Sequence, residues 1–485
     1  MSQATLQPQA PPSPGERSGS PSVALPFAAI VLAMLPAVLD QTILATALPV
    51  VAADLGRLSD VSWVVTAYVV AAAATTPVWG KLGDRHGRKL LLEVALLVFV
   101  LTSALCGAAQ DITQLILLRA VQGAAAGGLM TMAMAAVGDL VAPRERGRYQ
   151  GYIAATFAVA TIVGPLIGGV LVDHASWRWV FLVNLPIGAA ALAGLHLRLP
   201  ASQAAGADRP LDAPGAVLLA GATTALLLTC IWGGARYAWD SAAILALIAT
   251  TVVLTGALFV RERRAADPIV PFHLLRTGPV AIASAALFLA TAALFSVTVF
   301  VPLFLETTTG ASPTDAGLLL VPAMLGIAVS TTLSGRAIVR TGRYKRFPIA
   351  GLALMTAALV LLAVFAGHPS QIATGIALAV FGLGFGMVTQ VLVVAVQNSV
   401  DRRELGVATA TTGFFRALGG AVGAAVLGAV FAARAGAHSA AHMLRADVID
   451  GVQGVFLVAA PLAALALLIV LRLPELPLQT DNRKS

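Results

Sequence analysis

The sequence has few charged residues. Only 11% of its 485 residues are Asp, Glu, Lys or Arg, whereas 58% are hydrophobic, and a soluble domain carries about 25% charged residues. This composition excludes a water-soluble globular protein and also a disordered chain. The apolar residues form repeated blocks of about 20 residues, long enough to cross ~30 Å of hydrocarbon as helices. We therefore predict an all-α membrane protein.

Cysteines and catalytic motifs are also scarce. Cys106 and Cys230 both lie inside apolar blocks, which favours a packing role over a disulfide or a metal pair. The sequence lacks a G-x-x-x-x-G-K-[ST] loop, a G-x-S-x-G motif and an H-E-x-x-H motif, so no nucleotide, hydrolase or zinc-protease site is evident. We expect no enzyme activity, no metal and no cofactor.

The apolar blocks predict fourteen transmembrane helices. Their ranges are 25–50, 61–80, 90–110, 112–138, 149–171, 179–199, 212–233, 241–260, 279–304, 315–335, 347–367, 371–396, 406–431 and 452–472. Only Asp111 and its polar neighbours divide the third block from the fourth.

The proposed organisation has five parts. Residues 1–22, rich in Pro, Ser and Gln, are expected to form a disordered cytoplasmic tail, and no removable signal peptide is evident. A six-helix bundle over 23–200 is followed by an inserted helix pair with its loops over 201–276. A second six-helix bundle covers 277–472, and 473–485 form a second cytoplasmic tail.

The distribution of positive charge supports this count. Of the 31 Lys and Arg residues, 24 fall on the side of the N-terminus and five on the opposite side. Arg119 and Arg416 lie within apolar segments. Because cytoplasmic connections are enriched in Lys and Arg, both termini are predicted to be cytoplasmic. The net charge of +8 is thus an orientation signal, and we expect no nucleic-acid binding.

Two connections on the cytoplasmic side carry a weak internal repeat. GKLGDRHGRK at 80–89 and GRAIVRTGR at 335–343 both have glycines seven residues apart, and Val339 aligns with Asp84. Two repeats in the same orientation imply halves related by an axis along the membrane normal.

Asp40 lies in the middle of the first apolar segment, in LPAVLDQTILATALP. A carboxylate at that depth costs about 2.5–3.5 kcal/mol on insertion scales and marks a candidate functional site. Low dielectric disfavours its charged form, so one interpretation is a carboxyl that gains and loses a proton or attracts a cation. The alternative is a structural carboxylate paired permanently with an arginine.

Arg119 lies inside the fourth segment, in LLRAVQGAAAGG. A guanidinium at this depth must face a cavity or a polar partner, and near Asp40 it would tune proton binding there. A structural tether between helices is the alternative. Gln122 follows three residues later on the same helix face and is a candidate polar contact.

The connection between the second and third segments is charged and rich in glycine. Asp84 is expected near the positive N-terminus of a helix, while Arg85 and Arg88 reach carboxylates such as Asp139. A breakable contact between helices is therefore favoured over a plain positive connection. Its predicted members are Gly80, Asp84, Arg85, Gly87, Arg88, Asp139 and, one turn into the third segment, Glu93, for which an interfacial position is the alternative.

The fifth segment contains the sequence GPLIGG, with Gly164, Pro165, Gly168 and Gly169. Small residues four apart let helices approach closely, and the proline removes a backbone hydrogen bond. The motif predicts a tightly packed or flexible helix interface.

Taken together, these segments resemble the major facilitator superfamily, and within it the fourteen-helix drug:proton antiporter family. The segments that carry the resemblance are spread over nearly the whole chain. They are LDQTILATALP, WVVTAYVV, GKLGDRHGRK, LLRAVQGAAAGG, GPLIGG, SWRWVFLVNLPIG, GASPTDAGLLLVP and FFRALGGAVGAAV.

The resemblance implies a major-facilitator fold and proton-coupled export of small amphipathic compounds across a bacterial inner membrane. It implies proton coupling at Asp40 assisted by Arg119, gating at Asp84, Arg85 and Arg88, and an antiport role for Gly164–Gly169. The partners would be protons, a small-molecule substrate and the lipid bilayer, and the chain is expected to act as a monomer. A proton-coupled uptake carrier and a membrane sensor that moves nothing are the alternatives.

Seven polar residues are predicted to line a substrate cavity: Gln41, Thr42, Tyr68, Gln122, Asn184, Gln390 and Gln397. Val339 in place of an acidic residue argues against a second contact equivalent to that of Asp84. Glu306, where the family often has glutamine, favours either cationic substrates or a position among the lipid headgroups.

Overall fold

The computed structural model describes residues 23–55, 58–201, 212–234, 236–265, 267–269, 272–276, 278–309, 320–367, 370–435 and 445–478. Within these residues, fourteen helices are long and apolar enough to cross a membrane. The only bridge of the strand type found there is an isolated one between Gly233 and Tyr237. The predicted number of spans and the all-α class are confirmed. Residues 1–22 and 479–485 lie outside the described part.

The helices follow the predicted order, and several extend beyond the apolar blocks. They are α1 (Ala24–Leu55), α2 (Leu58–His86), α3 (Arg88–Gly107), α4 (Ile112–Leu140), α5 (Pro143–His174), α6 (Trp179–Leu182), α7 (Asn184–Arg198), α8 (Ala213–Trp232), α9 (Ala242–Glu262), α10 (Phe272–Arg276), α11 (Gly278–Thr309), α13 (Val321–Thr341), α14 (Arg346–Phe365), α15 (Gln371–Ser399), η1 (Arg402–Glu404), α16 (Leu405–Ala435) and α17 (Arg445–Val470). Together α6 and α7 form the sixth span.

The predicted loop Gly80–Lys89 is mostly helical, which corrects the sequence prediction. α2 continues to His86 and α3 begins at Arg88, so that Gly87 alone separates them. Hydropathy marks where apolar residues stop, whereas a helix ends where its backbone turns away, here at the positive φ of Gly87 (91°). The division at Asp111 is confirmed, because its side chain accepts a hydrogen bond from the Gln114 N–H at 2.8 Å and caps α4.

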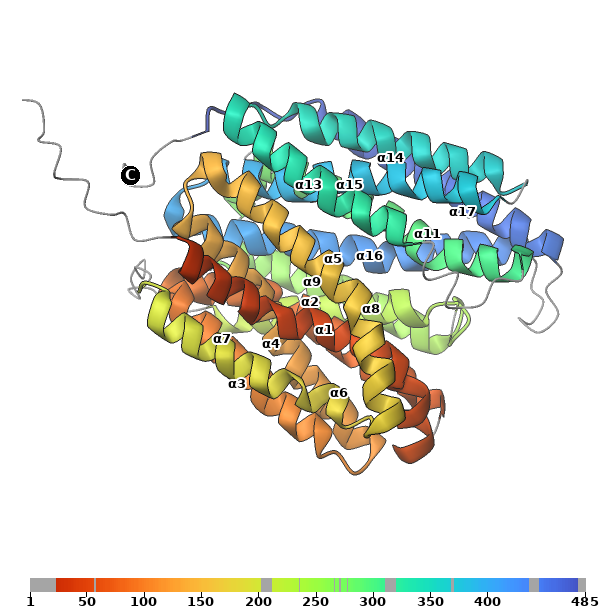
Figure 1. The fold of residues 1–485 in the computed structure, drawn as a ribbon, viewed down its shortest axis with the longest axis horizontal. Coiled ribbons are helices and arrows are strands. Elements are labelled where there is room, and N and C mark those ends of the chain that lie inside the picture. The colour runs from red at the N-terminus through yellow and green to blue at the C-terminus, as the bar shows by residue number, and fades with distance from the viewer. Residues whose placement is uncertain are drawn as a thin grey trace, which may run out of the picture.

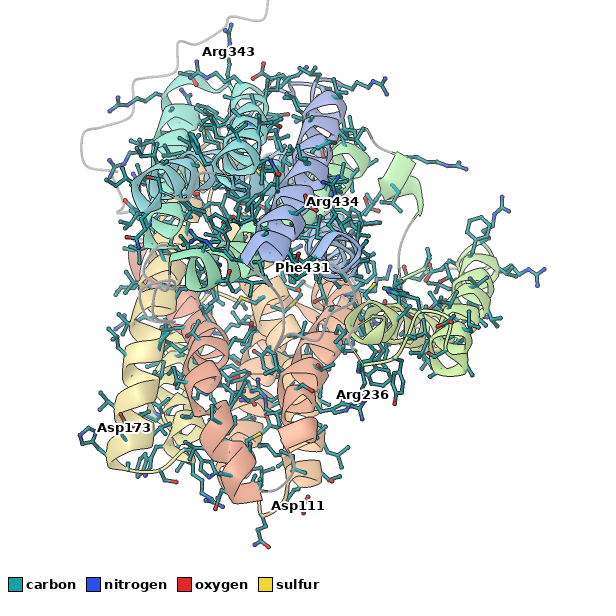
Figure 2. All side chains as sticks on the ribbon, turned by 90° about the vertical axis from the view of Figure 1, so that its right-hand side faces the viewer. Asp111, Asp173, Arg236, Arg343, Phe431 and Arg434 are labelled. Atoms are coloured by element: carbon teal, nitrogen blue, oxygen red, sulfur yellow. The ribbon has the colours of Figure 1, made fainter. Side chains whose placement is uncertain are left out.

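The helices form two halves with a helix pair beside them, as Figure 2 shows. α1 to α7 enclose two hydrophobic clusters that lie between Phe27 and Leu199, and α11 to α17 enclose one between Leu274 and Leu473. The inserted helices α8 and α9 pack on each other, and α8 also contacts α2 and α16. This is the predicted arrangement of two six-helix bundles with two added helices, whereas the residue bounds of the domains stay predictions.

The two halves meet at the end that carries the α2–α3 connection, which we call the latch end. There α5 packs on α13 so closely that a Cβ on Gly335 would lie 2.0 Å from the Gly147 carbonyl oxygen. A Cβ on Gly80 of α2 would similarly lie 2.9 Å from the carbonyl oxygen of Gly406 in α16. Gly80 and Gly335 are the first glycines of the sequence repeat, so equivalent helices make the two contacts. From this end α5 and α13 diverge along their length (Figure 1), and Leu166 farther along α5 is exposed.

Candidate functional site

Asp40 lies at the centre of a polar cluster buried inside the N-terminal half. Arg119 forms an ion pair with its Oδ2 atom, and the amides of Gln122 and Asn184 donate to its Oδ1 atom at 3.2 and 3.3 Å. Ser103 Oγ accepts a hydrogen bond from each amide, at 3.1 and 3.0 Å. The Asp40 side chain is completely buried. We call these five residues the Asp40 cluster.

Arg119 has several partners in addition to Asp40, among them Gln122, Val64 and Tyr68. It donates to Gln122 Oε1 at 2.7 Å and to the carbonyl oxygen of Val64 at 3.2 Å, and its guanidinium lies 4.2 Å from the centre of the Tyr68 ring. Cation–π contact of this kind is stabilising when the pair is desolvated. The guanidinium therefore keeps favourable contacts even when the carboxyl is neutral.

Glycines on α4 bring its neighbours close enough to form this cluster. Arg119 and Gln122 stand three residues apart and thus on one face of α4. A Cβ on Gly123 would lie 2.2 Å from the Tyr68 carbonyl oxygen, so glycine allows α2 to place Tyr68 against Arg119. The Tyr68 hydroxyl donates to the Ala37 carbonyl oxygen of α1 at 3.3 Å.

Three residues predicted to line a cavity instead belong to this buried region. Tyr68, Gln122 and Asn184 are almost completely buried and face Asp40 or Arg119. An amide in an apolar helix satisfies a buried charge as readily as it faces water, so a role of these residues in a substrate cavity stays a prediction. Ser103, which completes the cluster, was missed, since a single serine in an apolar segment gives no distinctive signal.

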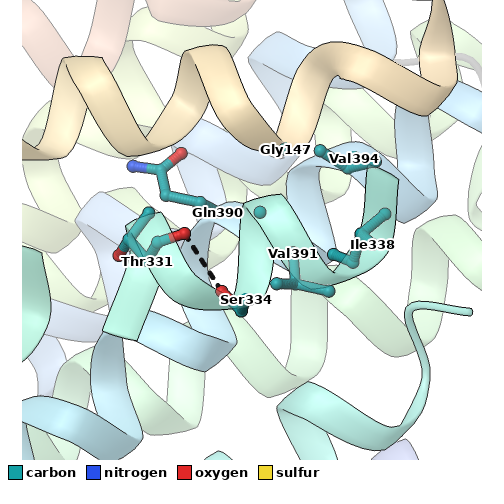
Figure 3. Close-up of a pocket in the computed structure, with 8 residues that line it drawn as sticks. Gly147, Thr331, Ser334, Ile338, Gln390, Val391 and Val394 are labelled. Carbon is teal, nitrogen blue, oxygen red and sulfur yellow. Dashed lines mark hydrogen bonds between the residues drawn. The ribbon is translucent and has the colours of Figure 1, made fainter. Parts of the chain in front are cut away.

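Two further cavity predictions, Gln390 and Gln397, fall at the latch end. Gln390 lines a narrow pocket between α5, α13 and α15, together with Gly147 and Ser334 (Figure 3). Gln397 is buried, and its amide donates to the carbonyl oxygen of Met134 in α4 at 3.3 Å. These glutamines therefore lie at the contact between the halves in this conformation, and their assignment to a substrate cavity stays a prediction.

The last two cavity predictions lie next to Asp40 on α1. Gln41 is exposed, whereas Thr42 is half-buried and its hydroxyl donates to the carbonyl oxygen of Leu39 at 3.0 Å. The side chain of Glu306 lies outside the described residues.

Asp84 joins the two halves at the latch end. Its carboxylate accepts hydrogen bonds from the backbone N–H groups of Gly406 and Val407 at 2.9 and 2.8 Å, at the positive N-terminus of α16. Arg88 donates to Asp84 at 2.7 Å and forms an ion pair with Asp139. We call these five residues the latch. The geometry expected for Asp84, Arg88 and Asp139 is thus present.

Other residues assigned to the latch have different positions. Gly80 packs against α16, Gly87 forms the turn, and Arg85 is half-buried in the last turn of α2. Glu93 lies 3.7 Å from His196 of α7, and this contact corrects its placement in the latch. Glu93 lies five residues after Arg88 on α3, which places it about 140° around the helix axis from Arg88, so it faces α7 rather than α16.

The repeat-related position in the C-terminal half lacks a carboxylate. There the Nε atom of Arg144, near the start of α5, donates to the backbone oxygen of Val339 at 2.9 Å. A contact to a neutral carbonyl is weaker than one between two charged groups. The latch is therefore asymmetric, in agreement with the prediction from Val339.

Arg146 is a further contact that the sequence prediction missed. It donates to backbone oxygens of Gly138 and of Val141, the latter at 3.1 Å. It also reaches the backbone oxygen of Gln397 in the other half at 3.1 Å. In the sequence it was counted only as one positive residue on the cytoplasmic side, because its partners are backbone atoms that carry no sequence signal.

The GPLIGG motif packs α5 against α1 next to Asp40. A Cβ on Gly164 would lie 2.0 Å from Thr42 Oγ1, and one on Gly168 would lie 2.3 Å from Thr46 Oγ1. Pro165 is exposed, and a Cβ on Gly169 would meet no atom within 4 Å. The close helix approach is thus present at two of the three glycines.

We expect Gly168→Ala and Gly169→Ala to change stability in opposite directions. The first forces α1 and α5 apart, at a cost of about 1–3 kcal/mol. The second meets no steric obstacle and favours the helix by roughly 0.5–1 kcal/mol. Thermal unfolding of the purified variants in detergent measures both. A Gly168→Ala protein as stable as the Gly169→Ala protein would contradict the packing described here.

These features define a class of protein. Two helical halves of equivalent topology span the membrane, meet at one end and enclose a buried charge pair in one half, as in secondary transporters built from parallel repeats. The chain belongs to the Major Facilitator Superfamily, because the model of that family matches its residues 30–424.

Sequence relatives include transporters from two bacteria. An uncharacterized MFS-type transporter of Mycobacterium tuberculosis is 40% identical over 82% of this chain, and the match spans only 58% of that relative's length. The multidrug transporter protein MdtP of Bacillus subtilis is 34% identical, with coverage of 81% of this chain and 72% of the relative. Multidrug resistance protein 3 of Bacillus subtilis is 32% identical, with coverage of 81% and 77%.

Solved structures share the fold at low sequence identity. The human organic anion transporter MFSD10 superposes with a TM-score of 0.67 at 17% identity, over 93% of this chain and 100% of its own. The proton:xylose symporter XylE superposes with a TM-score of 0.65 at 14% identity, over 93% and 96%. At such identity these similarities establish the fold alone.

Proposed function

We propose that this transporter exports small amphipathic compounds in exchange for protons, by alternating access between its two halves. The observation that carries the proposal is the buried Asp40–Arg119 pair. Charged side chains in a membrane interior cost free energy, and they mark candidate sites of proton or ion transport. The names of the two Bacillus relatives, which describe multidrug transport and resistance, support the substrate class. The charge distribution supports a cytoplasmic position for the latch end and a bacterial cell membrane as its location.

Proton binding at Asp40 would break the ion pair, but both side chains would keep hydrogen-bond partners. A neutral carboxyl still accepts from Gln122 and Asn184, and Arg119 keeps its bonds to Gln122 Oε1 and the Val64 oxygen. The partners that both groups retain offset part of the cost of leaving the Arg119 charge unpaired. Reversible proton uptake requires that both side chains have partners in the charged and in the neutral state. An ion pair with a purely structural role does not require this.

Two helices connect the Asp40 cluster to the latch end. α4 carries Arg119 seven residues after its start and Asp139, the partner of Arg88, near its end. α5 packs on α1 through Gly168 and on α13 through Gly147. A change at Asp40 that moves α1 or α4 therefore acts on the contact between the halves.

Coupling requires that the proton and the substrate each prefer a different conformation. One charge that crosses 100 mV supplies about 2.3 kcal/mol, which corresponds to a substrate gradient of roughly fiftyfold.

The proposal is tested in everted membrane vesicles that acidify their interior. Anionic and cationic amphipathic dyes are tested separately. At least one of the two kinds is expected to accumulate inside vesicles that contain the protein, and a protonophore should release it. Vesicles from cells without the gene provide the control. Accumulation that survives the protonophore would exclude proton coupling, and dye uptake into whole cells instead would indicate an importer.

A further inference from the structure

Arg416 is a charged residue that the proposed mechanism does not use. It lies eleven residues into α16 and is exposed. Among the described side chains, only Asp40, Arg119 and Arg416 carry charge at least seven residues from both ends of a spanning helix. Asp40 and Arg119 are buried and neutralise each other, whereas Arg416 forms no ion pair or hydrogen bond with any described residue.

The face of α16 that carries Arg416 points to the space between the halves. Gly413 and Gly420 stand three residues before and four residues after it, hence on the same stripe of the helix. A Cβ on Gly413 would lie 3.8 Å from Thr76 of α2 in the other half, whereas one on Gly420 would lie 3.6 Å from Thr291 of α11 in the same half. The stripe that carries Arg416 therefore lies between α2 of one half and α11 of the other. A guanidinium that faced lipid would be strongly disfavoured, so this placement also agrees with the chemistry of arginine.

We infer that Arg416 binds an anionic group of the exported compound, such as a carboxylate, sulfonate, phosphate or phenolate. The inference rests on the proposed function, in which the compound occupies the space between the halves, and it narrows the substrate class to organic anions with an apolar body. A guanidinium recognises planar anionic groups through two parallel hydrogen bonds. Asp40 does not offset this charge, because it is buried in the N-terminal half and paired with Arg119.

The charge of this space is measured with a reporter cysteine at Gly420, in a background of Cys106→Ser and Cys230→Ser. Anionic sulfonatoethyl and cationic trimethylammonium-ethyl methanethiosulfonates are compared by their rates of modification. Replacement of Arg416 by Gln is expected to lower the anionic-to-cationic rate ratio roughly tenfold, since one turn separates the two positions. Arg416→Lys should keep the ratio.

A cysteine at Gly428 of the same helix provides the matched control. It lies three turns from Arg416, beyond a Debye length of about 8–10 Å, so Arg416→Gln should leave its rate ratio nearly unchanged. An unchanged ratio at Gly420, or an equal change at Gly428, would overturn the assignment of Arg416 to the space between the halves.

Substrate class is then measured by dye binding to the purified protein without any proton gradient. Fluorescein and rhodamine 123 share a xanthene ring system, but fluorescein carries a carboxylate and a phenolate, whereas rhodamine 123 is a cationic methyl ester without an anionic group. Fluorescein is expected to bind at least tenfold more tightly, and Arg416→Gln should remove this preference. Tighter binding of rhodamine 123, or no binding of fluorescein, would overturn the inference. Because no gradient is present, a failure of proton coupling leaves this result unaffected.

Discussion

Asp40→Asn is expected to abolish proton-driven export while downhill exchange of substrate continues. Asparagine cannot gain or lose a proton in the working pH range, so the roughly fiftyfold accumulation that one proton per cycle supports at 100 mV should disappear. The measurement is dye accumulation in everted vesicles, together with equilibrium exchange of the same dye between two sides of equal pH. Wild-type accumulation by the Asp40→Asn protein would exclude Asp40 as the proton-binding group.

A loss of stability must be separated from this loss of coupling. Removal of one partner from a buried ion pair costs about 3–5 kcal/mol, although the bonds from Arg119 to Gln122 and Val64 reduce that cost. The double variant Asp40→Asn/Arg119→Gln removes both charges and keeps hydrogen-bonding groups. It should regain thermal stability relative to Asp40→Asn but not proton-driven export. If the double variant exported against a gradient, Asp40 would have only a structural role.

The sequence predicted the spans and the charged site residues for a simple physical reason. A charge inside an apolar block is visible in the sequence and has few acceptable environments in a membrane, so Asp40 and Arg119 could be selected and their proximity expected. The glycine repeat similarly indicated two equivalent connections. In the structure its first glycines, Gly80 and Gly335, lie at the two equivalent contacts between the halves.

Uncharged polar residues could not be placed in the same way. Asn184, Gln390 and Gln397 all read as polar residues in apolar helices, yet one faces Asp40, one lines a pocket at the latch end and one bonds to α4. Their positions depend on the rotation of each helix about its axis, which packing decides. The contact of Gly147 with Gly335 joins residues far apart in the chain, and no local pattern encodes it.

The hydrogen bonds of the latch determine how the protein responds to a substitution of Asp84. Asp84→Asn is expected to favour the conformation that is open at the latch end, by roughly 100-fold relative to the wild type. Asp84 accepts three hydrogen bonds, two from N–H groups of α16 and one from Arg88, and a bond to a charged group contributes about 1.5–3 kcal/mol. A neutral amide keeps part of these bonds, so a loss of about 3 kcal/mol follows, equivalent to roughly two factors of ten. The protein should then fail to close at this end, and export should stop.

Opening is measured by maleimide labelling of a cysteine at Thr409, again with Cys106 and Cys230 replaced by serine. Thr409 is 6% exposed and accepts a hydrogen bond from Gln397, so a cysteine there should react only when the halves separate. Asp84→Asn should accelerate labelling, whereas Glu93→Gln, which removes a carboxylate that pairs with His196, should not. Because both variants remove one negative charge at the same end of the molecule, equal acceleration would assign the effect to net charge. Acceleration by Asp84→Asn alone would assign it to the bonds at the N-terminus of α16.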